Sequence, residues 1–463
     1  MTDILILGAG LTGLSTALLL SRDGHRVTVV DRDPPPPPPG REWDEWQRPG
    51  VTQFRQAHFM LPFWHAQMRA DLPEVLDRLA AAGARRISFA ALLPPPVFDG
   101  GRPGDDRFDT LTARRPVLEA AFAAEAAHLD VRRGTAVAGL IARAGRVAGV
   151  RLADGTAMSA DLVVDCMGRR SPLRAWLVAA GFPAPAQERD DAGFVYYGRH
   201  FEGAMPAVNA PLLQHHDSVS ILTLPADNDT WSVGFVASTR DHALRALRDP
   251  ECWAAALACY PTAAHWADGK PLTGVDVMAG LADQWRTVTT PGVVAVGDSA
   301  CCTNPSLGRG AGIGLLHART LRDYLRAPDG DFAARTAAVI EPLYRATYWF
   351  DHHRIAEIDA DVAGVPYRPA DPAWFGARAL YGAALHDPEA ARVNLAAGLL
   401  LQPPPPPLSP PPPTAPGPPG PRYPLAGPDR NALLAALSPP KVVGAGSSLF
   451  PTFPAPRFPT VEA

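Results

Sequence analysis

The N-terminal end of the chain places a glycine-rich turn between two apolar segments. Ile4–Leu7 is an apolar run of strand length, the turn Gly8-Ala-Gly10-Leu-Thr-Gly13 follows, and an apolar helical pattern continues to Leu20. A second apolar run, Val27–Val30, ends directly before an acidic residue. This order predicts a strand, a turn, a helix and a second strand, which is the unit that builds a parallel sheet. We therefore expect an α/β fold.

The spacing of the three glycines predicts a dinucleotide-binding turn. Gly8 permits the tight turn, Gly10 lets a pyrophosphate approach the backbone, and Gly13 lets the helix pack closely on the strand. The N-terminus of the helix offers unpaired N–H groups and a partial positive charge to the phosphates. Asp31 is placed to accept the ribose hydroxyls, which favours FAD or NAD over NADP. The predicted contacts of this unit are Gly8, Gly10, Leu11, Thr12, Gly13, Asp31 and Arg32. A purely structural glycine turn is the alternative.

Two later segments favour FAD over NAD. Leu162–Asp165 is a buried-strand pattern that runs into Cys166-Met167-Gly168, and Val293–Val296 runs into Gly297-Asp298. The Asp298 carboxylate can hydrogen-bond the ribityl hydroxyls of a flavin, and the glycine-rich helix start that follows can face the electron-rich end of the ring. A generic strand–loop–helix is the alternative for this segment. The predicted contacts here are Gly168, Asp298, Pro305, Gly308, Gly310 and Ala311.

Changes in composition along the chain predict its domains. The FAD-binding domain is split over 1–184 and 281–330, and its sheet is expected to be mostly parallel. A β-rich segment over 185–280 is predicted as an inserted substrate-binding domain, with one helix near 241–257. A helical section covers 331–402, and 403–463 is predicted as a proline-rich extended tail because prolines cannot build a packed core there.

Charge and cysteine usage exclude several classes of protein. The net charge of -4 argues against nucleic-acid binding. The five cysteines have no metal-ligand spacing, so we assign no metal. The apolar N-terminal run lacks a basic flank and is interrupted by glycines, and no other run approaches the length of a membrane span. We expect a cytoplasmic protein without a membrane span.

The three motifs, in this order, resemble the FAD-dependent monooxygenase superfamily with the aromatic-hydroxylase fold. The resemblance covers roughly residues 1–330, and in appearance it is nearest to bacterial FAD epoxidases and hydroxylases of polyketide pathways. It rests further on Gly50-Val-Thr-Gln-Phe-Arg55-Gln-Ala-His58, Arg114-Arg115-Pro116-Val-Leu118 and the Asp165-x-x-Gly168-Arg-x-Ser171 segment. The resemblance implies that Arg55 and Arg115 approach the FAD and that Val137 offers its backbone to the adenine.

The same resemblance implies a monooxygenase. Reduced FAD would capture O₂ as a C4a-hydroperoxide and hydroxylate or epoxidise a hydrophobic small molecule, while the protein positions the substrate and excludes water. Met167-Gly168 stands where hydroxylases that bind NADPH usually have Asp-Gly. Electrons are therefore expected either directly from NAD(P)H or from a partner flavin reductase. No catalytic side chain is assigned.

The family resemblance also suggests which residues wall the substrate site. These are His58, Tyr196, Tyr197, Arg199, Trp231 and Phe235, for each of which a role in surface or core packing is the alternative. Three other functions remain open: an FAD-dependent reductase or dehydrogenase without oxygen transfer, a flavin halogenase, and a non-catalytic carrier. The halogenases of this superfamily carry a catalytic lysine in the first third of the chain, whereas the two lysines here are Lys270 and Lys441.

Overall fold

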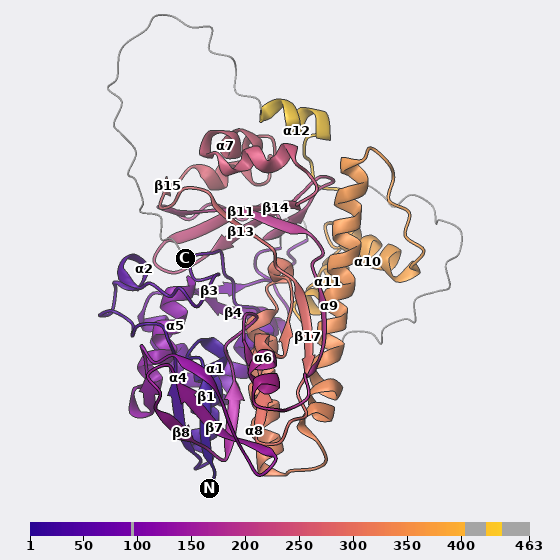
Figure 1. The fold of residues 1–463 in the computed structure, drawn as a ribbon. Coiled ribbons are helices and arrows are strands. Elements are labelled where there is room, and N and C mark those ends of the chain that lie inside the picture. Colours follow the sequence, from indigo (N-terminus) through magenta and orange to yellow (C-terminus); the bar gives the residue numbers. More distant parts are fainter. Residues whose placement is uncertain (94–96, 403–422, 438–463) are drawn as a thin grey trace, which may run out of the picture.

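The computed structural model describes residues 1–93, 97–402 and 423–437. Its lower part in Figure 1 contains the N-terminal sheet, and its upper part contains a second, antiparallel sheet. The lower sheet is parallel, with the strand order β18-β9-β1-β2-β5. Its strands are β1 (Asp3–Leu7), β2 (Arg26–Val30), β5 (Asp130–Arg132), β9 (Leu162–Asp165) and β18 (Val293–Ala295). The split α/β fold predicted from the sequence is confirmed.

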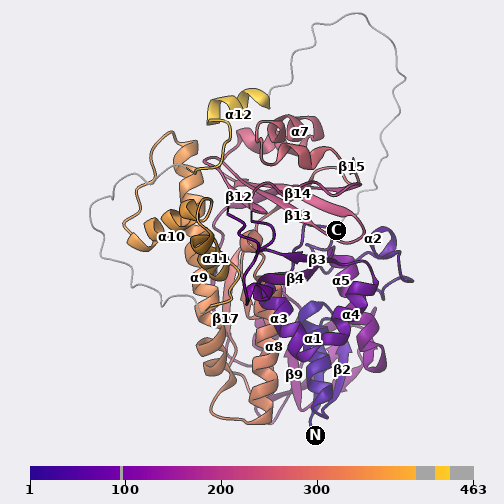
Figure 2. The same ribbon diagram turned by 180° about the vertical axis from the view of Figure 1, so that it is seen from behind.

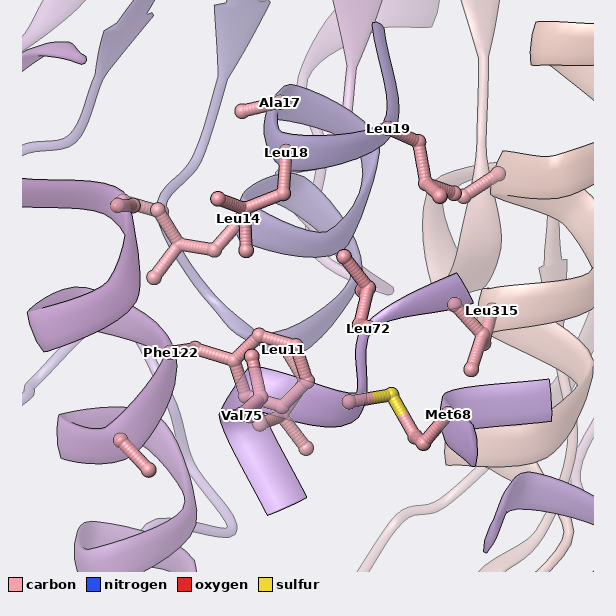
Figure 3. Packing of buried hydrophobic residues seen from close by; sticks show 14 of the residues in the cluster. Leu11, Leu14, Ala17, Leu18, Leu19, Met68, Leu72, Val75, Phe122 and Leu315 are labelled. Carbon is pink, nitrogen blue, oxygen red and sulfur yellow. The ribbon is translucent and has the colours of Figure 1, made fainter. Parts of the chain in front are cut away.

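Helices cover one face of this sheet and form a large apolar core with it. Helix α1 (Leu11–Arg22) is buried over most of its length between the sheet and its neighbouring helices. Its Leu14 and Leu18 pack with residues of the surrounding helices, as Figure 3 shows. Those helices are α3 (Pro62–Asp71), α4 (Pro73–Ala81), α5 (Arg115–Glu125) and α8 (Gly310–Arg326). The two shorter helices of this half are α2 (Glu42–Glu45) and α6 (Leu173–Ala179).

The upper sheet is antiparallel and has the order β12-β13-β14-β11-β15, with β16 also paired to β11. Helix α7 (Pro250–Ala258) packs on one face through Trp253, which contacts Phe201 and Phe235. The other face looks toward the parallel sheet (Figure 1). The strands are β11 (Phe194–Glu202), β12 (Leu213–His215), β13 (Ser220–Pro225), β14 (Thr230–Ser238), β15 (Lys270–Pro271) and β16 (Asp276–Ala279).

Smaller sheets join and flank the two halves. The pairing of β10 (Ala186–Asp190) with β17 (Asp283–Thr287) brings together the two chain segments that lead into and out of the inserted sheet. Strand β17 also pairs with β19 (Cys301–Cys302). The division at residues 184 and 280 stays a prediction. The remaining strands are β3 (Arg85–Ser88), β4 (Asp109–Thr112), β6 (Val137–Arg143), β7 (Arg146–Leu152) and β8 (Ala157–Ser159).

Three helices follow α8 within residues 331–402, as expected for a helical section. The long α9 (Phe332–Val362) runs beside both halves of the molecule, and both views show it there (Figures 1 and 2). Helices α10 (Pro372–Ala383) and α11 (Pro388–Gly398) pack against each other next to α9. Asp371 and Asp387 cap their N-termini by accepting backbone N–H groups, with proline at the first turn of each.

The structure differs from the sequence prediction at two places. The helix expected near 241–257 begins only at Pro250, where Asp249 accepts the N–H groups of Glu251 and Cys252; a 3₁₀ helix precedes it. In the predicted extended tail, α12 (Arg430–Ala436) is helical and packs on α7, because Leu433 joins the core of the inserted domain. The rest of that prediction, over 403–422 and 438–463, lies outside the described residues.

Candidate functional site

A large cavity of about 1080 Å³ lies between the parallel sheet, the inserted sheet and the C-terminal helices. One end is lined by Gly8, Gly10 and Asp31 of the N-terminal unit. The other end is lined by strands β11, β13 and β14 and by helices α10 and α11. A cavity of this size has room for a dinucleotide and a small-molecule substrate in contact with each other.

Packing requires glycine at two of the three glycine positions in the turn, whereas the third position faces open space. Gly8 has φ +99°, and a Cβ there would lie 2.7 Å from the Cys166 carbonyl oxygen. A Cβ on Gly13 would overlap the Gly8 carbonyl oxygen. A Cβ on Gly10, in contrast, would meet only a Glu119 oxygen at 4.0 Å. Gly10 is therefore not needed for packing and leaves free space in the cavity wall, as a bound pyrophosphate requires.

The helix ends at the cavity offer backbone donors. Among the described residues, no side chain caps the N-terminus of α1 or that of α8. Leu11 and Thr12 at the first end and Gly310 and Ala311 at the second line the cavity. Uncapped N–H groups and the partial positive charge at a helix N-terminus suit a phosphate or an electron-rich ring.

A buried network of charges surrounds Asp31. One Asp31 oxygen accepts the Ala9 N–H at 2.6 Å and an Arg48 Nη2–H at 2.6 Å, while the other accepts the Asp33 N–H. Arg48 also contacts Glu119, which pairs with Arg115 at 2.7 Å. Burial raises the pKa of the Glu119 carboxyl, but Arg48 and Arg115 more than offset this and leave the pKa below its ordinary value. These contacts fix the orientation of the Asp31 carboxylate.

Sequence reasoning missed Arg48 and Glu119 and placed weight on Arg55 instead. Arg48 lines the cavity, whereas Arg55 lies outside the lining, where its guanidinium stacks on Trp43 at 4.7 Å. The spacing of Arg115 and Glu119, four residues apart on one helix, is a signal that could have indicated the ion pair. No spacing in the sequence relates Arg48 to Asp31.

The second motif positions Gly168 at the cavity. Asp165 ends β9, accepts the Met167 N–H at 2.9 Å and accepts the Ser171 hydroxyl, so the turn that carries Gly168 is tied back to the strand. Burial raises the pKa of Asp165 to about 6.

The third motif brings Asp298 to the cavity wall at the start of the segment that leads into α8. Burial raises the pKa of Asp298, and the charges of Arg115 and Arg169 offset this only in part. The other predicted cofactor positions found in the lining are Arg32, Val137, Pro305 and Gly308. The cofactor residues predicted from the sequence therefore line one end of the cavity, apart from Gly13, which lies in the packing behind it, and Arg55.

Of the predicted substrate residues, only His58 and Tyr196 line the cavity. Successive side chains of a strand point to opposite faces, so Tyr196 and Tyr197 cannot both face the cavity. Tyr197 pairs with Phe235 across β11 and β14, and both pack in the core under α7 together with Trp231. Arg199 lies on the same side, 5.5 Å above the Trp253 ring.

The hydrogen bonds of His58 define its tautomer. Arg115 can only donate, so His58 Nε2 accepts from it at 3.1 Å; the Gln56 carbonyl can only accept, so Nδ1 donates to it at 2.9 Å. Burial, and next the charge of Arg115, lower the pKa of His58 to about 3. His58 is therefore a neutral side chain at physiological pH and cannot serve there as a charged acid.

The other end of the cavity has an apolar wall. Strands of the inserted sheet contribute Leu222 and Leu224, and the face of α10 and α11 that looks inward contributes aliphatic side chains. The sequence did not indicate that these two helices reach the site. The apolar lining includes Phe59, Leu61, Phe89, Leu92, Leu212, Met278, Leu380, Ala384, Leu395 and Leu399.

In residues 1–93, 97–402 and 423–437, no group of three or more His, Cys, Asp or Glu side chains could hold a metal ion. None of the helices in that part of the chain has the length and hydropathy needed to cross a membrane.

Comparison with known sequences supports the nucleotide-binding prediction. Residues 3–38 match the family described as FAD dependent oxidoreductase, and residues 119–200 match tryptophan halogenase. Protein Rv3254 of Mycobacterium tuberculosis is 27% identical over 402 residues, which cover 76% of this chain and 81% of that protein. Monooxygenase 2 of Arabidopsis thaliana is 28% identical over 192 residues, which cover 40% of this chain and 41% of that protein.

Comparison with solved structures identifies the fold. PqsL, a probable FAD-dependent monooxygenase from Pseudomonas aeruginosa, superimposes with a TM-score of 0.57 at 19% identity, over 78% of this chain and 98% of that chain. The myxobacterial chondrochloren halogenase CndH has a TM-score of 0.56 at 19% identity, over 77% of this chain and 82% of that chain. The fold is that of the FAD-dependent monooxygenases. Together with the match at residues 3–38, this fold supports an enzyme of the FAD-dependent oxidoreductase kind and supports the predicted cofactor FAD.

Proposed function

We propose that the protein is a monooxygenase that hydroxylates or epoxidises a hydrophobic small molecule. The observation that carries the proposal is the continuity of the cavity. The same cavity joins Gly10, Asp298 and the α8 N-terminus to the apolar wall of Leu222 and Leu224. When bound, FAD supplies the reduction of O₂ and the transfer of one oxygen atom.

The residues around the cofactor end would hold the FAD. Asp31 would accept the ribose hydroxyls, the backbone at Gly10 and the α1 N-terminus would contact the pyrophosphate, and Asp298 would accept the ribityl hydroxyls. Val137 would offer its backbone near the adenine, since it lines the same end.

The residues around the apolar end would exclude water and accept a hydrophobic substrate. Phe59, Leu212 and Leu399 come from three distant parts of the chain and line the cavity together. Excluding water protects oxygen transfer from the competing release of peroxide. O₂ and the hydrophobic compound are the proposed co-substrates, with electrons from NAD(P)H or from a partner flavin reductase.

Halogenation is the second candidate, because residues 119–200 match tryptophan halogenase and CndH has the same fold. The family resemblance ties that activity to a lysine at the site. Among the described residues that line the cavity there is no lysine, and Lys270 is exposed and pairs with Glu202 at 2.5 Å. Lys441 lies outside the described residues. The lining therefore favours oxygen transfer.

The test uses purified protein reconstituted with FAD and supplied with ¹⁸O₂, NADH or NADPH, and a panel of alkenes and phenolic compounds. We expect one ¹⁸O atom in a product, and no halogenated product when chloride or bromide is added. A parallel series with an added flavin reductase identifies the electron source. Reduction of the substrate without ¹⁸O incorporation would establish the reductase alternative instead.

A pair of variants tests the cofactor site. Asp298→Ala should purify without FAD, whereas Asp106→Ala, an exposed acidic residue outside the cavity lining, should retain it. An Asp298→Ala protein with a full complement of FAD would contradict the assignment of Asp298.

A further inference from the structure

Three buried polar side chains lie behind the segment 303–309 and outside the cavity lining. They are Asp283 on β17, Asn304 in the segment itself and Asp351 on α9, and none is more than 1% exposed. Their neighbours in the segment, such as Pro305 and Ser306, do line the cavity. The proposed function assigns these three side chains no role, although they stand directly behind the cofactor end.

Each of the two carboxyl groups holds one point of the segment. Asp283 Oδ1 accepts the Asn304 N–H at 2.8 Å, and Asp351 Oδ1 accepts the Ser306 hydroxyl. Asn304 Oδ1 accepts the Ser306 N–H at 3.3 Å and so caps the short 3₁₀ helix Pro305–Leu307. The segment is thus fastened from both sides, to a strand and to a helix that are far apart in the sequence.

The same contacts fix the orientation of Tyr196 at the cavity wall. The backbone N–H of Ser306 can only donate, so the Asn304 amide atom facing it is the oxygen. The Tyr196 hydroxyl contacts that same oxygen and must therefore donate its proton to it. The lone pairs of the Tyr196 oxygen are left as hydrogen-bond acceptors.

This arrangement is costly for the fold. Within the described part of the chain, Asp283 Oδ2, Asp351 Oδ2, Asn304 Nδ2 and Arg309 Nε are buried without a hydrogen-bond partner. A buried polar atom without a partner destabilises a protein. A cluster of such atoms behind a cavity segment calls for a reason other than stability.

Charged and titratable groups on several neighbouring elements influence the pKa values of the two carboxyl groups. Asp283 is influenced by His352 of α9 and by Asp190 and Asp191 at the end of β10. Asp351 is influenced by Asp283 and Arg309. Burial raises the pKa of both carboxyls, that of Asp283 to about 6.

We propose that Asp283 and Asp351 are positioning residues that brace the segment 303–309 and thereby set the affinity of the cavity for FAD and substrate. The inference rests on the proposed function for the substrate only, since FAD binding is independent of oxygen transfer. Removal of either carboxyl would free the backbone at Asn304 or the side chain of Ser306. The segment would then no longer present Pro305 and Gly308 to the cofactor in one conformation.

The test compares Asp283→Ala and Asp351→Ala with Asp283→Asn and Asp351→Asn, by titrating each apoprotein with FAD and following flavin fluorescence. Each alanine variant should bind FAD about 10-fold more weakly, the effect expected for one lost hydrogen bond. Each asparagine variant should stay within about 3-fold of the wild type, because the amide oxygen can still accept the same N–H or hydroxyl.

The matched control is Asp241→Ala. Asp241 is also a buried carboxyl, but it pairs with Arg430 at 2.7 Å in the inserted domain and does not line the cavity. This variant should lose thermal stability without a change in FAD affinity. If Asp283→Ala and Asp351→Ala also lose stability without a change in FAD affinity, the two residues do not position the segment 303–309 for FAD binding.

A second measurement covers the case in which the alanine variants do not fold. Ser306→Ala removes only the hydroxyl that Asp351 accepts, so this variant should bind FAD about 10-fold more weakly, as expected for Asp351→Ala. A Ser306→Ala protein that binds FAD as tightly as the wild type would overturn the inference. Wild-type protein that binds FAD but incorporates no ¹⁸O would refute the proposed function without affecting the role inferred for Asp283 and Asp351.

Discussion

The contrast between Gly10 and Gly13 gives the sharpest prediction. The two positions carry the same residue on the same turn, yet a methyl group at Gly10 would meet only one protein atom at 4.0 Å, whereas a methyl group at Gly13 would overlap the Gly8 carbonyl oxygen. Gly10 has φ −86°, which alanine adopts without strain. Gly10→Ala should therefore fold, and Gly13→Ala should not fold normally.

The magnitudes follow from these contacts. Without FAD, Gly10→Ala should change the free energy of unfolding by no more than about 1 kcal/mol. The added methyl group would occupy the open space at Gly10 through which the backbone is proposed to reach the pyrophosphate. Loss of one charge-assisted hydrogen bond, about 1.5–3 kcal/mol, corresponds to roughly 10- to 100-fold weaker FAD binding.

The assay combines urea unfolding of the apoprotein with FAD titration of Gly10→Ala and the wild type. A Gly10→Ala protein that binds FAD within about twofold of the wild type would refute the placement of the pyrophosphate beside Gly10. A loss of stability as large as that of Gly13→Ala would refute the claim that the space at Gly10 is reserved for a ligand.

Three more predictions concern stability. Arg48→Met should destabilise the fold by about 3–5 kcal/mol in urea unfolding, because it leaves the buried carboxylates of Asp31 and Glu119 without their shared partner; a loss below about 1 kcal/mol would count against the network. Leu14→Ala should cost about 2–5 kcal/mol by opening a cavity in the core of Figure 3, while leaving the FAD affinity of the folded protein unchanged. Burial raises the pKa of Asp165 from 3.8 to about 6, so the folded state binds this proton more tightly than the unfolded state does and stability falls as the pH rises from about 4 to about 6. The loss is about 3 kcal/mol, and Asp165→Asn should remove it; an unchanged pH slope in that variant would show that Asp165 is not its source.

The nucleotide unit was the most predictable part of the protein. Gly8, Gly13 and Asp31 act through contacts within a short stretch of chain or between adjacent strands, so their spacing in the sequence already reflects their geometry. The position of Asp298 at the cavity wall was predictable for the same reason, because this residue comes shortly after strand β18 of the parallel sheet.

The substrate end was less predictable. Tyr196 and Tyr197 were indistinguishable as residue types, and only the pairing of β11 with β14 decides which of them faces the cavity. Strand alternation requires that one of the two point away, but it does not say which. The aliphatic residues of α10 and α11 gave no signal, because apolar helix faces look alike whether they cover a core or a cavity.

Local spacing was enough to predict the strand–turn–helix unit and the three segments expected to bind FAD, because each of them is a strand followed directly by a turn. Only the tertiary structure brought Arg48 to Asp31 and placed Asp283 and Asp351 behind Asn304 and Ser306. Those partners are separated along the chain and meet only when strands and helices pack. Buried ion pairs and hydrogen bonds of this kind depend on positions in space, for which a single sequence carries no periodic signal.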